Sequence, residues 1–289
     1  MTLKYIWHHP FAGKHRSKAV GAYLRWQVLS RCLRDGAAIM PFTGKTKLYI
    51  VPNLHGATGN IYLGLHEFHE MSFLLHFLRP EDLFFDIGAN VGSYTVLAAG
   101  HCGARTITCE PVDSTYRVLS KNVALNELAG LAQTRQIAVG DQEGSVSITE
   151  GLDAKNHVVQ GGDSSHGTTV EVPVTTLDLL ASDGAPRLIK IDVEGYESFV
   201  FRGGTDTLAN EGLEAIIVEL SPDTLEESHE RLTSNGFTPF RYEPFTRKLE
   251  PRDSPTTSDN LIYVRDSRLD SVRQRLAESS PVDLPWQSF

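Results

Sequence analysis

The chain has 289 residues, 40% of them hydrophobic and 22% charged, and its 27 basic and 36 acidic side chains leave a formal net charge of -9. This composition is ordinary for a globular protein with a full core, but the acidic balance is a poor match for nucleic-acid phosphates. Three cysteines without CxxC spacing suggest neither a disulfide framework nor a metal site, so we expect a cytoplasmic protein without a nucleic-acid partner.

The N-terminal segment is basic and has neither a secretory signal nor an apolar run long enough to span a membrane. No acidic residue precedes Asp35. A helix over residues 14–34 would be basic and amphipathic. Its apolar face would hold Tyr23, Leu24, Trp26, Val28, Leu29, Cys32 and Leu33. Such a helix either packs on the main domain or contacts an anionic surface such as a membrane, and the sequence leaves both interpretations open.

The pattern changes near residue 80. We therefore expect an N-terminal extension over 1–79, a main domain over 80–266, and a C-terminal helix with an irregular tail over 267–289. Runs of β-branched and aromatic residues broken by Gly and Pro predict short strands within 36–65.

His66, Glu67, His69 and Glu70 follow that strand-rich region. They could be metal ligands on a helix, but the H-E-x-x-H pattern is absent, which favours a solvated helix face.

Strands and helices alternate through the main domain, which is typical of a doubly wound α/β fold with a mostly parallel sheet. The predicted strands lie at 82–87, 106–110, 134–139, 187–192, 213–220, 237–242 and 260–265. The predicted helices lie at 91–99, 113–128, 197–209 and 223–234. An inserted hairpin is predicted from "SVSIT" and "TVEVPVTTL", which flank the Gly- and Ser-rich segment 161–167.

The segment "LFFDIGANVGSYT" predicts a buried strand that ends in a tight turn and enters a helix. Gly88 and Gly92 remove side chains where the backbone must approach something closely. A doubly wound sheet binds its ligand at the carboxyl ends of the strands, so Gly88, Ala89, Asn90 and Gly92 are candidate cofactor-binding residues. Asp86 would repel a pyrophosphate but could hold an ammonium group.

Glu110 ends the next strand, roughly 20 residues after Gly88, with Pro111 behind it. A carboxylate there is suited to accept hydrogen bonds from a ribose diol, which indicates a cofactor that contains a nucleoside. The turn lacks the middle glycine of the G-x-G-x-x-G dinucleotide fingerprint. S-adenosylmethionine carries an ammonium group and a ribose but no phosphate, so it fits better than a nicotinamide dinucleotide.

A second polar turn follows a later strand in "LIKIDVEGYESFV", where Lys190, Asp192, Glu194 and Glu197 surround Gly195. Lys190 and Asp192 share one strand face at the same sheet edge as the first turn. They could form a polar wall that faces the reactive group. They could also be a buried ion pair beside acids that complement a helix dipole.

These segments together resemble the FkbM-type S-adenosylmethionine-dependent methyltransferases, a branch of the class I methyltransferase fold. The resemblance covers residues 80–265 and rests on "DIGANVGSYT", "EPVDSTYRVLSKNVALN", "AVGDQEG", "TLDLL", "IKIDVEGYE", "IIVEL" and "NLIYVR" in that order. It implies a Rossmann-like sheet of seven strands whose last strand is antiparallel. It also implies that Asp86, Gly88 and Asn90 line the methionine part, Glu110 holds the ribose, Ala138 lies near adenine, and Asp192 faces the methyl group. Glu67 and Glu70 resemble the acidic position that precedes the first strand in many relatives.

The resemblance implies an O-methyltransferase that acts on a hydroxyl of a sugar, a glycan or another natural product. We expect Asp192 to be the general base and Lys190 to set its charge state, with Glu194, Glu219 or a histidine as alternatives. His157 is the most interesting histidine because it lies on the insertion that could close over the site. The competing hypotheses are an NAD(P)-dependent sugar oxidoreductase or epimerase and a catalytically silent binding module.

Overall fold

The computed structural model describes residues 6–7, 9–10, 16–33, 36–52, 55–150, 158, 168–252, 260–284 and 288–289. Its centre is an eight-stranded sheet with the strand order β12-β11-β13-β10-β9-β3-β4-β5. The strands are β3 (Leu83–Ile87), β4 (Arg105–Cys109), β5 (Ala132–Arg135), β9 (Leu188–Ile191), β10 (Ala215–Val218), β11 (Phe237–Glu243), β12 (Lys248–Pro251) and β13 (Leu261–Arg265). β3 pairs in parallel with β4 and β9, so it is an interior strand, and the carboxyl ends of these three strands lie at the same end of the sheet.

The predicted doubly wound fold is confirmed, including the antiparallel last strand: β13 runs antiparallel to both β10 and β11. The short strand β12 adds an eighth member at the edge beside β11. The strand predicted over 134–139 is divided instead. β5 stays in the main sheet, whereas β6 (Ala138–Gly140) leaves it and pairs with β8 (Thr168–Thr176).

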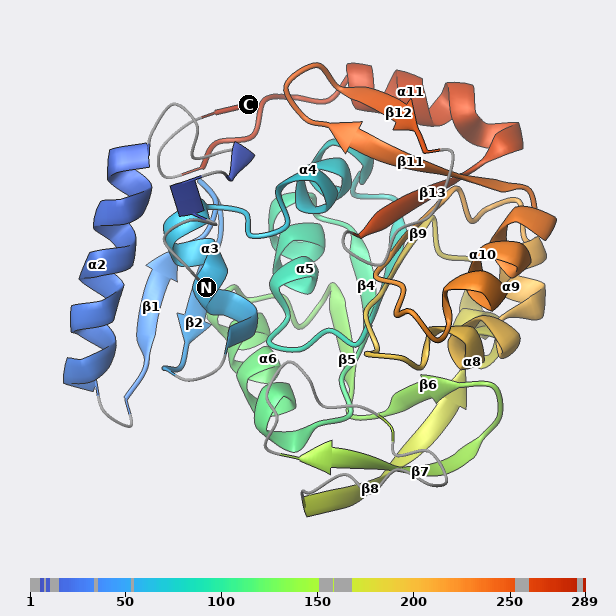
Figure 1. Ribbon diagram of the computed structural model, residues 1–289, viewed down its shortest axis with the longest axis horizontal. Helices are drawn as coiled ribbons and strands as arrows, with labels where there is room; N and C mark the ends of the chain where they lie inside the picture. Colours follow the sequence, from blue (N-terminus) through green and yellow to red (C-terminus); the bar gives the residue numbers. More distant parts are fainter. Residues whose placement is uncertain are drawn as a thin grey trace.

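Helices cover both faces of the main sheet, as Figure 1 shows with α4, α5 and α6 on one side and α8, α9 and α10 on the other. Neighbouring residues of each strand point to opposite faces, so Phe84 packs in one hydrophobic core and Phe85 in the other. The first core contains α4 (Phe68–Phe77), α5 (Ser93–Thr95), the π-helix η2 (Val96–His101), α6 (Asp113–Leu125) and α11 (Leu269–Ala277). The second contains α7 (Leu177–Leu180), α8 (Glu197–Arg202), α9 (Thr205–Ala209) and α10 (Leu225–Ser234).

Two helix predictions differ from the structure. The helix predicted over 91–99 is a short α-helix that continues as the π-helix η2. The helix predicted over 197–209 is broken into α8 and α9 at Gly203 and Gly204. A Cβ on Gly203 would lie 2.0 Å from the carbonyl oxygen of Gly140, so the end of β6 crosses the chain at this point and only glycine fits.

The predicted inserted hairpin is present as β7 (Gly144–Glu150) and β8, which pair antiparallel over the full length of β7. With β6 they form a separate three-stranded sheet. Its apolar residues Ile148, Val172 and Val174 pack with Ala138 and with Val112, the residue that precedes α6. The insertion is therefore fixed beside the carboxyl end of β4.

The N-terminal extension contains α2 (Arg16–Leu33), the two-stranded sheet of β1 (Ala38–Pro41) and β2 (Lys47–Ile50), and α3 (His55–Leu63). The strands expected over 36–65 are present in the first part of that range, but its last part is the helix α3. Trp26 of α2 is buried, whereas Leu24 and Val28 are 55% and 65% exposed, so the predicted apolar face of α2 is only partly covered. Within the described part of the chain, no helix is long and apolar enough to cross a membrane.

Candidate functional site

A cavity of about 310 Å³ opens at the carboxyl ends of β3, β4, β9 and β10. Most of the residues predicted from the sequence line it: Asp86, Gly88, Ala89, Asn90, Glu110, Pro111, Ala138, Lys190, Asp192 and Glu194. Its wall also includes His66 and Glu67 from the segment before α4, and Ile148 and Val158 from the insertion. The cavity thus joins two polar turns to an apolar wall.

Gly88 brings the two polar turns together. Its φ angle is +76°, and a Cβ at this position would lie 1.9 Å from the carbonyl oxygen of Asp192. The close approach expected at Gly88 is therefore to the end of β9. Gly92, at φ +83°, faces the side chain of Leu119 and is not among the residues that line the cavity.

Glu110 is 5% exposed and is held by three hydrogen bonds at the end of β4. One carboxylate oxygen accepts from the Asn90 N–H at 2.8 Å. The other accepts from the Val112 N–H at 2.9 Å and from the Thr115 hydroxyl at 2.8 Å. Burial raises the pKa of Glu110, and these three donors oppose that effect. They also fix the direction in which the carboxylate faces the cavity.

Asp86 lies at the same end of the cavity and is almost fully buried. The Thr95 hydroxyl donates to its carboxylate at 2.6 Å. Burial raises the pKa of Asp86 to about 6, against the opposing effects of this hydrogen bond and of Lys190 on the neighbouring strand. A cationic ligand next to Asp86 would favour the charged form of the carboxyl group.

Lys190 and Asp192 form the predicted ion pair at the end of β9, with 3.1 Å between Nζ and a carboxylate oxygen. The Lys190 side chain is buried, and its ammonium group lies 5.4 Å from the centre of the Tyr94 ring. Burial alone would lower the pKa of Lys190, but the carboxylates of Asp192, Glu67 and Glu219 outweigh it and raise that pKa. Lys190 is therefore a permanent cation in this wall.

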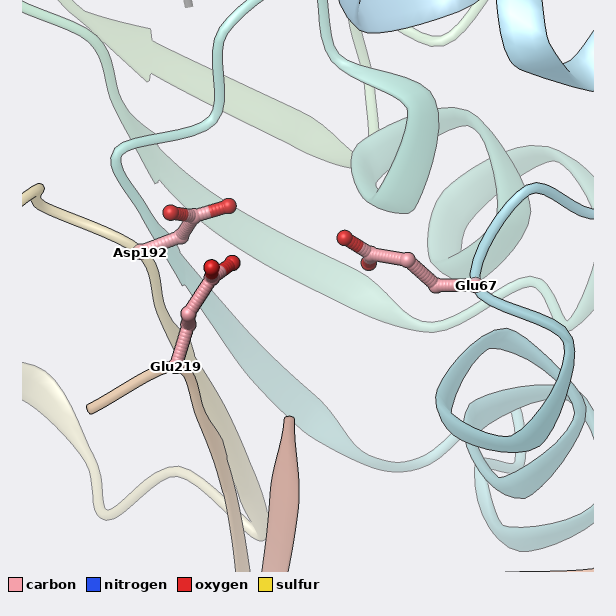
Figure 2. Close-up of side chains that lie close together, drawn as sticks. All are labelled: Glu67, Asp192 and Glu219. Carbon is pink, nitrogen blue, oxygen red and sulfur yellow. The ribbon is translucent and has the colours of Figure 1, made fainter. Parts of the chain in front are cut away.

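Glu67, Asp192 and Glu219 form a group that we call the three-carboxylate group. Each contributes an oxygen atom, and these atoms lie within 4.8 Å of one another. Figure 2 shows Glu67 pointing toward Asp192 and Glu219, which stand at neighbouring strand ends. All three residues line the cavity. Such a group attracts cations, and the cation beside it in the described structure is the Lys190 ammonium.

The solvated helix face predicted for residues 66–70 is wrong. Glu67 accepts a hydrogen bond from the Tyr94 hydroxyl, and Lys190 with this donor lowers the pKa of Glu67 despite its burial. His66 lines the cavity next to it. Glu70 is 8% exposed and lies on the buried side of α4. The residue pattern of one helix could not reveal this, because α4 is buried on nearly all sides between β11 of the sheet and the helices η2 and α11.

Glu197 has a different role from the other acidic residues of its motif. It is buried and does not line the cavity. Its carboxylate accepts from the Gly195 N–H at 2.8 Å, from the Ser221 hydroxyl at 2.9 Å and from the Thr224 hydroxyl. It therefore ties the turn after β9 to the turn after β10.

This edge-of-sheet geometry agrees with a comparison of the sequence with protein families. A model described as the methyltransferase FkbM domain matches residues 86–280. The chain belongs to the FkbM methyltransferase family.

Individual relatives of this FkbM-family chain are distant. The hexuronic acid methyltransferase AglP of Haloferax volcanii is 25% identical over 151 residues, which are 51% of this chain and 59% of that protein. The methyltransferase FkbM from Methylobacillus flagellatus KT is 16% identical, with a TM-score of 0.46. The match covers 86% of this chain and 60% of that protein. A precorrin-6y C5,15-methyltransferase from Geobacter metallireducens GS-15 is 12% identical with a TM-score of 0.41, over 69% and 89% of the two chains.

Other site residues of the FkbM-family chain were missed or lie outside the described part. His157 is outside the described residues. Its neighbour Val158 lines the cavity and bridges to Ile148 of β7. The alternating pattern of "SVSIT" indicates that Ile148 faces inward, but the sequence does not show against what.

Proposed function

We propose that this FkbM-family methyltransferase transfers a methyl group from S-adenosylmethionine to a hydroxyl group of a sugar or glycan. The observation that carries the proposal is the position of Glu110, fixed at the end of β4 beside the glycine turn after β3. A carboxylate at this point of a doubly wound sheet is suited to a ribose hydroxyl.

The residues at this end of the cavity fit S-adenosylmethionine. Three of the roughly four acceptor positions of the Glu110 carboxylate are used within the protein, which leaves one on the oxygen beside Asn90 for a ribose hydroxyl. Val112, Ala138 and Ile148 offer an apolar wall for an adenine. Asp86 suits the ammonium group of the methionine part. S-adenosylmethionine, when bound, supplies a methyl group on a positively charged sulfur.

The other end of the cavity would hold the acceptor. Lys190, Asp192 and Glu219 supply both a hydrogen-bond donor and several acceptors for a hydroxyl group. Glu194, at φ +44°, stands in the same turn as Asp192 and also lines the cavity. Alignment of the acceptor oxygen with the methyl group would provide much of the rate, and a proton acceptor roughly 10²–10⁴-fold more.

The printed name of the Haloferax relative supports a sugar as acceptor, since that protein is a hexuronic acid methyltransferase. This chain matches 59% of that protein, and the matched region does not identify the acceptor. A hydroxyl of another natural product would use the same chemistry.

Calorimetric titration with S-adenosylmethionine and with NADH tests the cofactor. We expect binding of the first and none of the second. Binding of NADH but not of S-adenosylmethionine would support an oxidoreductase or epimerase. The absorbance of bound NADH would provide a second measurement of such binding.

Methyl transfer is tested with methyl-labelled S-adenosylmethionine and the glycan fraction of cells that lack the protein. Mass spectrometry of glycans from cells with and without the protein should show the loss of one methyl increment. Binding of S-adenosylmethionine without any transfer to glycans or other metabolites would indicate a silent binding module.

We also propose that α2 contacts an anionic membrane surface from the cytoplasmic side. Arg25 and Arg31 are exposed beside Leu24 and Val28, and no acidic residue interrupts the helix. The three free cysteines are compatible with a cytoplasmic location. Full-length protein should co-sediment with vesicles rich in phosphatidylserine, and an Arg25→Glu/Arg31→Glu variant should not. Equal sedimentation of both proteins would contradict this contact.

A further inference from the structure

Within the three-carboxylate group, the three side chains differ in what they bind. Glu67 accepts a hydrogen bond from the Tyr94 hydroxyl. Asp192 is paired with the Lys190 ammonium at 3.1 Å. In the described parts of the chain, the Glu219 carboxylate has no hydrogen bond and no ion pair, and it is exposed where it lines the cavity. Glu219 is therefore the member whose oxygens are open to a ligand.

Glu219 is also held firmly by its backbone. Its N–H donates to the Ile191 carbonyl oxygen of β9. Two residues further on, Ser221 is bound by Glu197, which also binds the turn after β9. The side chain thus projects from a strand end whose neighbour is the strand end of Asp192. A group on a rigid element keeps a constant distance to an acceptor that Asp192 and Lys190 orient.

We propose that Glu219, rather than Asp192, takes the proton from the acceptor hydroxyl, and that Lys190 and Asp192 position this hydroxyl. This inference rests on the proposed methyl transfer. The acceptor O–H bond breaks and its proton passes to a Glu219 oxygen. The oxygen lone pair forms the new bond to the methyl carbon, and the electron pair of the broken C–S bond stays on the sulfur of the methyl donor.

The electrostatic surroundings support this assignment. The Glu219 side chain is exposed to the cavity, but the surrounding wall partly desolvates it, and this raises its pKa to about 7. The negative charges of Asp192, Glu67 and Glu194 add to the effect, while Lys190 opposes it. His66 lines the same cavity, and burial lowers its pKa below the ordinary value for a histidine. A proton acceptor is most effective when its pKa lies near the working pH. Asp192 would lose its ion pair with Lys190 on taking up a proton.

The first test needs no acceptor substrate. Carbon NMR of the side-chain carboxyl groups, with the Glu219 signal identified by its absence in Glu219→Gln, should show Glu219 titrating near pH 7. A midpoint below pH 5.5, about one unit above that of an ordinary Glu, would overturn the proposal.

The second test measures methyl transfer to the glycan fraction of cells that lack the protein. Glu219→Gln should lower the rate at pH 8 about 100-fold and remove the rise of rate with pH, with little change in S-adenosylmethionine affinity. Glu219→Asp, which keeps a carboxylate, should restore part of the rate. Glu230→Gln on the exposed face of α10 is the matched control and should behave as wild type.

Asp192→Asn separates the two carboxylates. Because the Asp192 charge raises the pKa of Glu219, its removal should move the midpoint of the pH–rate profile to lower pH while the profile persists. Two results would make Asp192 the proton acceptor instead. One is a rate of Asp192→Asn that no longer depends on pH, and the other is a Glu219→Gln variant that keeps more than about a tenth of the wild-type rate. A wild-type protein that binds S-adenosylmethionine but methylates nothing in the fraction would contradict the proposed function itself.

Discussion

The two ends of the cavity are built in different ways. At the end proposed for the cofactor, Asp86, Asn90 and Glu110 come from two consecutive strand ends, and each carboxylate receives hydrogen bonds from nearby donors. At the end proposed for the acceptor, Glu67, Asp192 and Glu219 come from three distant segments and gather around one ammonium group. The first end is a local, hydrogen-bonded frame, and the second is an electrostatic assembly that depends on tertiary structure.

The difference explains why the carboxylates can have different tasks. Hydrogen bonds from N–H and O–H groups satisfy Glu110 and fix its direction, which suits recognition of a ligand. Carboxylates that share a single cation repel one another, and this repulsion helps to raise the pKa of Glu219. A raised pKa suits proton transfer.

The largest expected effect comes from Gly88, where the two ends touch. Gly88→Ala would place a Cβ 1.9 Å from the Asp192 carbonyl oxygen at a φ angle of +76°. We expect a loss of about 4 kcal/mol in the free energy of unfolding and loss of S-adenosylmethionine binding. Denaturant unfolding of Gly130→Ala, a site with open space around it, is the control. Near-wild-type stability of Gly88→Ala would show that the stability of the fold does not depend on the close approach of Gly88 to Asp192.

The next effect concerns Glu197, whose hydrogen bonds link the turns after β9 and β10. Glu197→Ala removes the acceptor of three hydrogen bonds and should cost about 2–3 kcal/mol of stability. The rate of methyl transfer should fall as Asp192 and Glu219 lose their relative position, while S-adenosylmethionine still binds. Thermal unfolding and calorimetry measure the two effects, with exposed Glu226→Ala as control. A cofactor affinity that falls as much as the rate would contradict this division.

A smaller and more selective effect is expected at the cofactor end. Glu110→Gln replaces one accepting oxygen with an amide that faces N–H and O–H donors. Binding of S-adenosylmethionine should weaken by about 1.5–3 kcal/mol, and the rate at saturating cofactor should change little. Unchanged affinity in a folded variant would exclude Glu110 as a ribose ligand.

The smallest expected effect is the pH dependence of cofactor binding. The pKa of Asp86 is raised to about 6, so its carboxyl group loses its charge as the pH falls below that value. S-adenosylmethionine affinity should therefore drop several-fold between pH 7 and pH 5, because the ammonium group loses its partner. The pKa of Glu110 is raised as well, so Asp86→Asn is needed to separate the two. If Asp86→Asn has the same pH dependence of affinity as the wild type, the titrating group is Glu110 and not Asp86.

Much of the cofactor end could be predicted from the sequence because its signals are local. A strand, a glycine turn and an acid at the next strand end occur within Leu83–Glu110, and their order in the chain is their order in space. The reason for Gly88 could not be predicted, since its neighbour is the backbone at Asp192, far along the chain. The break of the helix at Gly203 has the same cause, an approach of β6.

The acceptor end shows the opposite case. Asp192 and Lys190 were identified from their motif. The residue pattern assigned Glu67 to a solvated helix face, and only the family resemblance matched it to an acidic position, while Glu219 was one alternative among several. Their proximity arises because β9 and β10 are neighbours in the sheet and the segment before α4 lies opposite these strand ends. No spacing in the sequence encodes that contact.

The sequence by itself determined the doubly wound sheet and the carboxylates at the strand ends, because periodicity and turn residues are local properties. The antiparallel last strand was implied by the resemblance to FkbM-type methyltransferases. The tertiary structure alone decided which carboxylates share an ammonium group and which one is open to the cavity. The physical reason is that charge–charge interactions depend on distance and burial in space, and neither follows from distance along the chain.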